Sequence, residues 1–244
     1  MDCYIIVTCY SMLWTILTVI LTLSTLYSLT STKWLIGSER FYEERYVITA
    51  QTRPDFPSEL EYRPETEVMT RSYNPTIGLY NRCLRTSAQS DYISCGSFAS
   101  NIGSGHDVFP ISWQVSLVLS GVASLLLFVT MVFALLSLCV RDFCRKSIFT
   151  ISGLIQVISG LFYSVAIAIY PLGWSSSKLH YFCGTQVAAF KKDQCSIGWA
   201  YIGVIICTLC IFPTGMLSIK ADRATSQDEI EDEILKGKRL ICIK

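Results

Sequence analysis

The chain has 244 residues, of which 51% are hydrophobic and 16% charged, and its formal net charge is +1. This composition is too apolar and too weakly charged for a soluble domain of this size, and it is typical of a membrane protein. The near-zero net charge offers no electrostatic basis for binding nucleic acid, so we expect no nucleic-acid partner.

Four segments contain no Asp, Glu, Lys, Arg or His, and each is longer than the ~20 residues that cross a hydrocarbon core. They predict one tetraspan domain over residues 1–244. We place its membrane spans at about 4–31, 112–140, 148–170 and 197–219. Residues 32–111 and 171–196 then lie on one side of the membrane, and residues 141–147 and 220–244 lie on the other.

The short loop between the second and third predicted spans carries Arg141, Arg145 and Lys146. Short basic loops stay on the cytosolic side of a membrane, so this loop indicates the orientation. An even number of spans puts both termini on the same side as this loop. We therefore expect a multi-pass plasma-membrane protein with cytosolic termini, and with 32–111 and 171–196 extracellular.

The first span repeats hydroxyl side chains at intervals of three and four residues, which keeps them on one seam of the helix. The members of this seam are Thr8, Ser11, Thr15, Thr18, Thr22 and Thr25. Such a seam packs closely in lipid, either against the protein's own helices or against a span of another protein. We hypothesise that Thr15, Thr18 and Thr22 line a groove that faces a partner.

The first extracellular segment predicts strands at 47–49 and 76–84, because β-branched and aromatic residues there are bounded by prolines. Between them, residues 53–71 mix charges with prolines and offer little apolar surface to bury. We interpret this stretch as an exposed excursion, either a solvated loop or an insertion specific to a partner.

Cysteines divide between the two sides of the membrane. Cys83 and Cys95 fall in the first extracellular segment, and Cys183 and Cys195 in the second. Disulfides form in oxidising compartments, and four cysteines allow three connectivities, of which closeness along the chain favours the two pairs within each segment. On the cytosolic side, Cys139 and Cys144 are either buried small hydrophobes or palmitoylation sites.

The remaining spans also carry small residues on regular faces. Gly153 and Gly160 lie one heptad apart, and Gln156 between them is the one strongly polar side chain deep in a predicted span. Glycine faces allow two helices to approach closely. For Gln156 we weigh an interhelical hydrogen bond against contact with a ligand or ion.

Two motifs resemble known membrane-protein families. Trp34, the triplet Gly78-Leu79-Tyr80, and the pair Cys83 and Cys95 resemble the claudin-superfamily signature, with Tyr80 where that signature has Trp. This resemblance implies an extracellular β-sheet whose strands the cysteine pair ties together, with Trp34 at the membrane rim. The fold class that we expect is a membrane α+β fold, a left-handed four-helix bundle with a small disulfide-linked, claudin-like sheet.

The second motif surrounds the third and fourth spans. Its residues are Tyr170, Pro171, Leu172, Gly173, Trp174, Ser176, Cys183, Gly184, Phe190, Cys195, Ile197, Gly198, Trp199, Ala200 and Tyr201. This block resembles the LHFPL (lipoma HMGIC fusion partner-like) tetraspan family. The resemblance implies an auxiliary subunit that binds, stabilises and helps to traffic or gate a membrane complex such as a mechanotransduction or ligand-gated channel.

Catalytic and metal-binding motifs do not appear in the sequence, so we expect no enzyme activity and no cofactor. The partners that we expect are an integral membrane protein, such as a channel subunit or adhesion receptor, and membrane lipid, with a homodimer as a further possibility. The alternative function is a claudin-like protein of cell–cell adhesion or a barrier. A small neutral-lined pore is a third reading.

Overall fold

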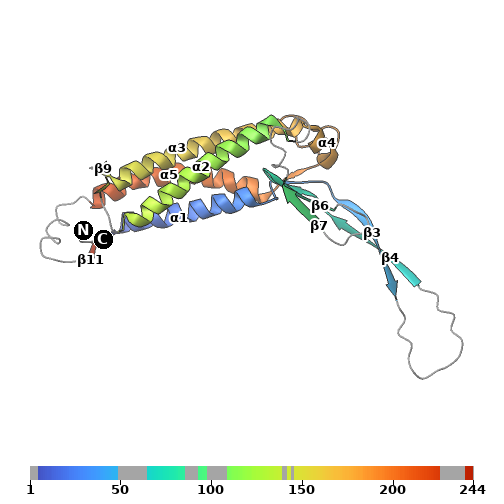
Figure 1. Ribbon diagram of the computed structural model, residues 1–244, viewed down its shortest axis with the longest axis horizontal. Coiled ribbons are helices and arrows are strands. Elements are labelled where there is room, and N and C mark those ends of the chain that lie inside the picture. Colours follow the sequence, from blue (N-terminus) through green and yellow to red (C-terminus); the bar gives the residue numbers. More distant parts are fainter. Residues whose placement is uncertain are drawn as a thin grey trace, which may run out of the picture.

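The computed structural model describes residues 5–48, 65–85, 93–97, 109–138, 142–143, 146–225 and 240–243. Four long helices lie side by side, with a β-rich cap at one end and both chain termini at the other (Figure 1). The four helices are α1 (Cys9–Thr30), α2 (Ile111–Leu136), α3 (Ile148–Ile169) and α5 (Trp199–Thr225). All four are long and apolar enough to cross a membrane. The expected tetraspan, claudin-like fold class is confirmed.

The helices form a ring in which each one packs against two neighbours, since α1 and α3 both contact α2 and α5. Large apolar side chains cover the outside of the ring, where Leu125, Leu154 and Leu209 are 63%, 63% and 66% exposed. Inside the ring, small and hydroxyl side chains pack together with a few large ones such as Trp14, Leu127 and Tyr163. This inverted pattern suits lipid, which already solvates leucine but offers hydroxyl groups no hydrogen bond.

Hydroxyl groups join α2 to α3. The Ser116 hydroxyl donates to the Ala166 carbonyl oxygen at 2.9 Å, and the Ser159 hydroxyl donates back to the Ala123 carbonyl oxygen at 2.8 Å. Each hydroxyl is fully buried, so the facing backbone carbonyl satisfies it in the absence of water.

Two glycines on α3 allow α5 to pack closely against it. A side chain at Gly153 would collide with Ser218, and one at Gly160 would approach Ile211 to 2.9 Å.

Gln156, between the two glycines, accepts a hydrogen bond from the Trp14 indole at 3.3 Å. This bond crosses the bundle from α1 to α3, so the interhelical alternative for Gln156 is the one that the structure shows.

The cap is an antiparallel five-stranded sheet in the order β10-β2-β5-β6-β7. Its strands are β2 (Leu35–Ile36), β5 (Thr76–Ile77), β6 (Asn81–Arg85), β7 (Ile93–Ser97) and β10 (Ser196–Ile197). Because β10 comes from the segment before the fourth span and the other strands follow the first span, the sheet joins both loops at this end of the bundle.

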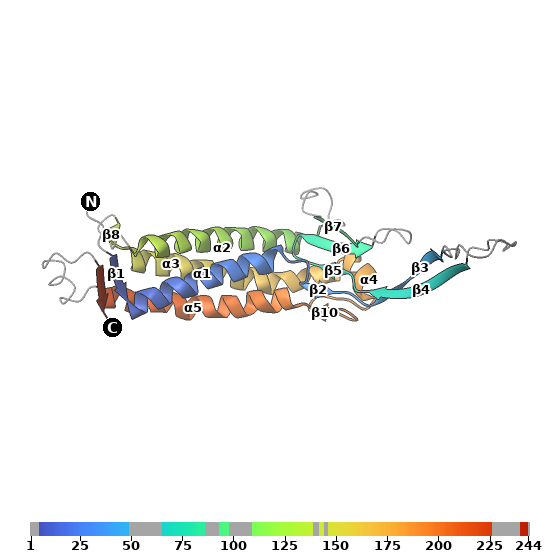
Figure 2. The same ribbon diagram turned by 90° about the horizontal axis from the view of Figure 1, so that it is seen from below.

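A two-stranded ribbon extends from the cap away from the helices (Figure 2). It consists of β3 (Arg40–Ile48) and β4 (Glu65–Tyr73), which pair antiparallel from Arg40 opposite Tyr73 to Ile48 opposite Glu65. The expected exposed excursion over 53–71 includes most of β4, since residues 65–71 pair with β3, a strand that the sequence did not predict there. The sequence signal was weak because the pairing partner is distant in the chain and rich in charge.

The segment between α3 and α5 begins with a 3-10 helix, η2 (Tyr170–Ser175), and continues into the short helix α4 (Ser177–Cys183). At the opposite end of the bundle, β1 (Ile5–Thr8) pairs in parallel with β11 (Leu240–Ile243), and β8 (Asp142–Phe143) pairs with β9 (Lys146–Ser147). The first residues of the expected span 4–31 thus form a strand, and Thr8 and Ser11 cap the start of α1 reciprocally.

The last helix continues past the expected end of the fourth span at residue 219 and reaches Thr225. Its Asp222 carboxylate accepts hydrogen bonds from the Ser147 hydroxyl at 2.6 Å and the Thr150 hydroxyl at 2.9 Å. Both donors lie at the start of α3. A charged residue that normally marks the end of a span therefore holds two helices together.

Replacing Asp222 with Ala should lower the free energy of unfolding by about 1–3 kcal/mol, because two hydrogen bonds to a charged acceptor are lost. Thermal unfolding in detergent or nanodiscs, followed by tryptophan fluorescence, measures this change. The exposed neighbour Lys220 provides the control. Equal stability of the Asp222→Ala and Lys220→Ala proteins would show that the contact does not hold the helices.

Candidate functional site: the junction of bundle and cap

Five aromatic side chains meet where the spans end and the cap begins. This aromatic junction consists of Trp34, Trp113, Tyr170, Trp174 and Tyr201, each no more than 6% exposed. The Tyr170 ring lies at its centre, with ring centroids 4.8 Å from Trp34, 5.3 Å from Trp113, 5.4 Å from Tyr201 and 6.3 Å from Trp174. Edge-to-face and offset contacts at such distances are favourable for aromatic rings.

Hydrogen bonds at their polar tips set the orientation of three of these rings, whereas the Tyr170 hydroxyl and the Trp174 indole N–H are buried without a hydrogen-bond partner among the described residues. The Trp34 indole donates to the Ser28 carbonyl oxygen of α1 at 2.8 Å. The Trp113 indole donates to the Tyr170 carbonyl oxygen, and the Tyr201 hydroxyl to the Ile167 carbonyl oxygen, each at 3.0 Å. The aromatic junction therefore ties all four spans to one another at the base of the cap.

Three glycines allow backbones to approach at this level. A Cβ at Gly173 would collide with the Trp113 indole, one at Gly198 with the Lys33 carbonyl oxygen, and one at Gly78 would come within 2.5 Å of the Ser31 carbonyl oxygen. Gly198 also donates its N–H to the Trp34 carbonyl oxygen at 2.8 Å. These positions need glycine because any side chain would separate the cap from the helices.

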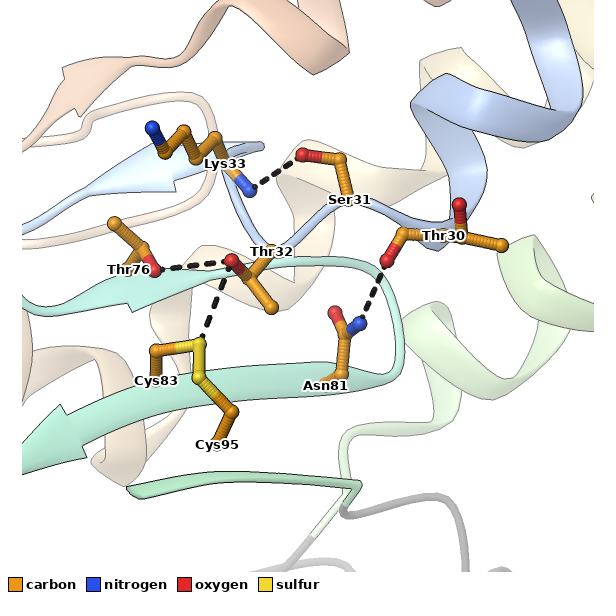
Figure 3. Close-up of a disulfide and its surroundings, with 8 residues drawn as sticks. All are labelled: Thr30, Ser31, Thr32, Lys33, Thr76, Asn81, Cys83 and Cys95. Carbon is orange, nitrogen blue, oxygen red and sulfur yellow. Dashed lines mark hydrogen bonds between the residues drawn. A yellow bond between two sulfur atoms is a disulfide. The ribbon is translucent and has the colours of Figure 1, made fainter. Parts of the chain in front are cut away.

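The first disulfide joins Cys83 and Cys95, which lie directly opposite each other on β6 and β7. Figure 3 shows that it lies beside Thr32, whose hydroxyl oxygen is 3.6 Å from the Cys83 sulfur. On the same strand, the Asn81 amide donates to the Thr30 carbonyl oxygen at 2.9 Å, at the end of α1. The disulfide and this bond fix β6 over the exit of the first span.

The second disulfide joins Cys183, at the end of α4, to Cys195, just before β10. Both cysteines are buried in the core, and Gln194 donates its N–H to the Cys183 carbonyl oxygen at 3.1 Å. The expected pairing of Cys83 with Cys95 and of Cys183 with Cys195 is confirmed.

The comparisons with known proteins agree with this geometry. A family model described as "Lipoma HMGIC fusion partner-like protein" matches residues 10–220. The chain belongs to the LHFPL family. It is 33% identical over 241 residues to LHFPL tetraspan subfamily member 2a protein of Danio rerio, and 34% identical over 245 residues to LHFPL tetraspan subfamily member 2 protein of Homo sapiens. Each alignment covers 99% of both proteins.

Another LHFPL relative is more distant. LHFPL tetraspan subfamily member 3 protein of Danio rerio is 24% identical over 167 residues, which is 64% of this chain and 71% of that protein. The resemblance to the LHFPL family that the sequence motifs indicated is confirmed.

Most residues of the claudin-type motif and of the LHFPL motif lie in the aromatic junction or beside it. Leu79 and Pro171 are buried, and Tyr80 is half-buried. Trp199 instead faces outward at 43% exposure and stacks on Tyr27 at 5.3 Å. Trp113 belongs to the aromatic junction but carried no motif signal, because its partner Tyr170 is distant in the chain.

The threonine groove expected on the first span is wrong. Thr15, Thr18 and Thr22 are only 6%, 0% and 0% exposed, because the hydroxyl seam faces the inside of the bundle. The Thr15 hydroxyl donates to the Ser11 carbonyl oxygen at 2.9 Å and lies 3.4 Å from the Ala134 carbonyl oxygen of α2. This LHFPL protein uses the seam for its own packing, which was the other alternative.

Two further expectations concern modification and metal sites. Cys139 and Cys144, the expected palmitoylation sites, lie outside the described residues. Within the described parts of the chain, no group of three or more His, Cys, Asp or Glu side chains is placed to hold a metal ion. The interactions at the aromatic junction are contacts between rings and hydrogen bonds to the backbone.

Replacing Gly173 with Ala should destabilise the protein by about 1–3 kcal/mol, because the new methyl group overpacks the junction against Trp113. Gly121 on α2 provides a matched control, since a Cβ there meets no atom within 4 Å. Gly121→Ala should be neutral or stabilising by up to about 1 kcal/mol, as Ala favours helix. Thermal unfolding in nanodiscs separates the two, and equal effects would contradict the role of Gly173.

The two disulfides should differ in their rate of reduction, because thiol exchange needs access to a sulfur atom. Cys95 is exposed, whereas Cys183 and Cys195 are 0% and 3% exposed. Under native conditions a mild reductant should open the Cys83–Cys95 bond first. Alkylation followed by peptide mass spectrometry measures this order, and simultaneous opening would mean that the cap unfolds before either bond reacts.

Proposed function

We propose that this LHFPL protein is a non-enzymatic auxiliary subunit of a membrane complex. In this role it binds an integral membrane partner, such as a subunit of a mechanotransduction or ligand-gated channel, and helps the complex to assemble, traffic or gate. The observation that carries the proposal is the β3–β4 ribbon, which reaches beyond the disulfide-linked cap (Figure 1).

The ribbon has the properties of a recognition element. Among the described strands, β3 pairs with β4 and with no other, so the outer edge of each strand presents backbone N–H and C=O groups. A two-stranded ribbon is marginally stable by itself in water, and a free edge can pair with an extended segment of another protein. Phe41 at its base is 70% exposed. Contact with a partner would cover such a surface.

The structure also supports one orientation of the protein in the membrane. The β8–β9 turn lies at the same end of the bundle as the terminal strands β1 and β11 (Figure 2). In the sequence, this short loop carries Arg141, Arg145 and Lys146, and a short basic loop favours the cytosol. Both disulfides lie at the opposite end, where an oxidising exterior would preserve them. We therefore place the termini in the cytosol and the ribbon outside the plasma membrane.

Excising the ribbon tests the proposal. Tyr42 pairs with Arg71, so replacing residues 43–70 with an Asn-Gly turn closes a short hairpin and leaves the cap and both disulfides intact. Recovery of co-purified channel subunits should fall roughly tenfold or more, equal to about 1.4 kcal/mol of binding free energy. The control is Ser94→Ala, an exposed position on the other edge of the cap. Unchanged recovery would contradict recognition by the ribbon.

The ribbon also fits the alternative, a claudin-like adhesion or barrier protein, because it extends from the cap away from the helices (Figure 1), as contact with a neighbouring cell would require. Adhesion requires association between two membranes, whereas an auxiliary subunit binds within one. Aggregation of otherwise non-adherent transfected cells, lost on excising the ribbon, would favour adhesion. Dispersed cells together with co-purified channel subunits would favour the auxiliary role.

A further inference from the structure

A tight turn in the second extracellular segment presents an aromatic ring to its surroundings. Ala188 and Lys191 form its base, with hydrogen bonds from the Ala188 N–H to the Lys191 carbonyl oxygen at 3.1 Å and from the Lys191 N–H to the Ala188 carbonyl oxygen at 2.9 Å. Ala189 and Phe190 occupy the two central positions. The Cys183–Cys195 disulfide closes the segment that carries this turn.

Phe190 has an unfavourable backbone conformation for its type. Its φ is +62°, in the left-handed region that Gly and Asn normally occupy in turns and that a bulky side chain rarely adopts. Its ring is 64% exposed, so packing within the protein does not compensate for this strain. Strained residues of this kind often mark contact sites.

The turn lies at the level where the membrane spans end. The Phe190 N–H donates to the Pro171 carbonyl oxygen at 3.3 Å, and Pro171 directly follows Tyr170 of the aromatic junction. Leu172, the next residue, is 45% exposed. The exposed pair of Tyr27 and Trp199 lies where the first span ends and the fourth begins, at the depth that such rings prefer in a bilayer.

Positive charge adjoins the aromatic ring. Lys191 is exposed and Lys192 half-buried, so two ammonium groups follow Phe190 directly. The nearest acidic residue in sequence, Asp193, already accepts a hydrogen bond from the Gln186 N–H at 3.2 Å. An apolar ring followed by lysines at headgroup depth matches the boundary between acyl chains and phosphates.

We propose that the turn from Ala188 to Lys191 is a phospholipid-binding tip. Phe190 inserts at the acyl–headgroup boundary of the surrounding membrane, and Lys191 and Lys192 bind headgroup phosphates. Lipid burial of the Phe190 ring offsets the strain of its backbone. The tip would hold the second extracellular segment against the membrane and so fix the height of the cap.

A photocrosslinking series in phosphatidylcholine proteoliposomes tests this inference. A benzophenone-bearing phenylalanine analogue is placed in turn at position 190, at 209 and at 41 in the full chain. Leu209 is 66% exposed in the middle of α5 and reports lipid, whereas Phe41 is 70% exposed on the ribbon and provides a matched aromatic control away from the membrane. Mass spectrometry identifies the adducts.

We expect lipid adducts at positions 190 and 209 and none at 41. Lipid adducts at 209 without any at 190, or protein adducts at 190, would overturn the proposal.

Combining the label at 190 with Lys191→Glu and Lys192→Glu should lower the yield of lipid adducts at position 190 severalfold. An unchanged yield would show that the lysines do not belong to the site. A Phe190→Gly variant tests the backbone strain, because glycine adopts a positive φ without cost. If the variant keeps both disulfides and full thermal stability, strain at Phe190 is supported. A large loss of stability would instead mean that Phe190 packs within the protein.

Discussion

The position of the whole cap depends on the packing of Tyr170 among Trp34, Trp113, Trp174 and Tyr201. These side chains come from segments that are distant in the chain, and they meet at the level where the helices end below the cap. Because indole and phenol groups pair an apolar body with a polar tip, these rings fill the junction, and Trp34, Trp113 and Tyr201 also hydrogen-bond its backbone. A displaced ring would tilt the sheet, the β3–β4 ribbon and the second extracellular segment together.

The bundle below the aromatic junction follows from lipid as the solvent. Lipid tails surround leucine as well as another helix does, so helices gain from close approach and from satisfied hydroxyl groups. Ser116 and Ser159 exchange bonds with facing carbonyl oxygens, and Gly153 admits Ser218. The same rule explains why the threonine seam of α1 is internal. The cap and the outer faces of the helices are therefore among the surfaces available to another protein.

The cap presents two surfaces of opposite character on one base. The ribbon extends away from the bundle (Figure 1), and neither of its strands pairs with a further described strand, which suits recognition of a protein. The Phe190 turn stays beside Pro171 at the end of the third span, which suits recognition of lipid. In an LHFPL protein that acts on a partner, the second surface would hold the first at a defined height above the membrane.

The sequence by itself determined the number of spans and the family, and it favoured the two cysteine pairs that the structure shows. Runs without charge, local motifs and short cysteine separations are all readable along the chain. Tertiary structure alone decided which face of α1 is buried, that Trp113 completes the aromatic junction, that β4 pairs with β3, and that Asp222 links two helices beyond the expected end of a span. Each of these depends on contacts between residues far apart in the chain. Periodicity shows that a seam exists, but it does not show which neighbour covers it.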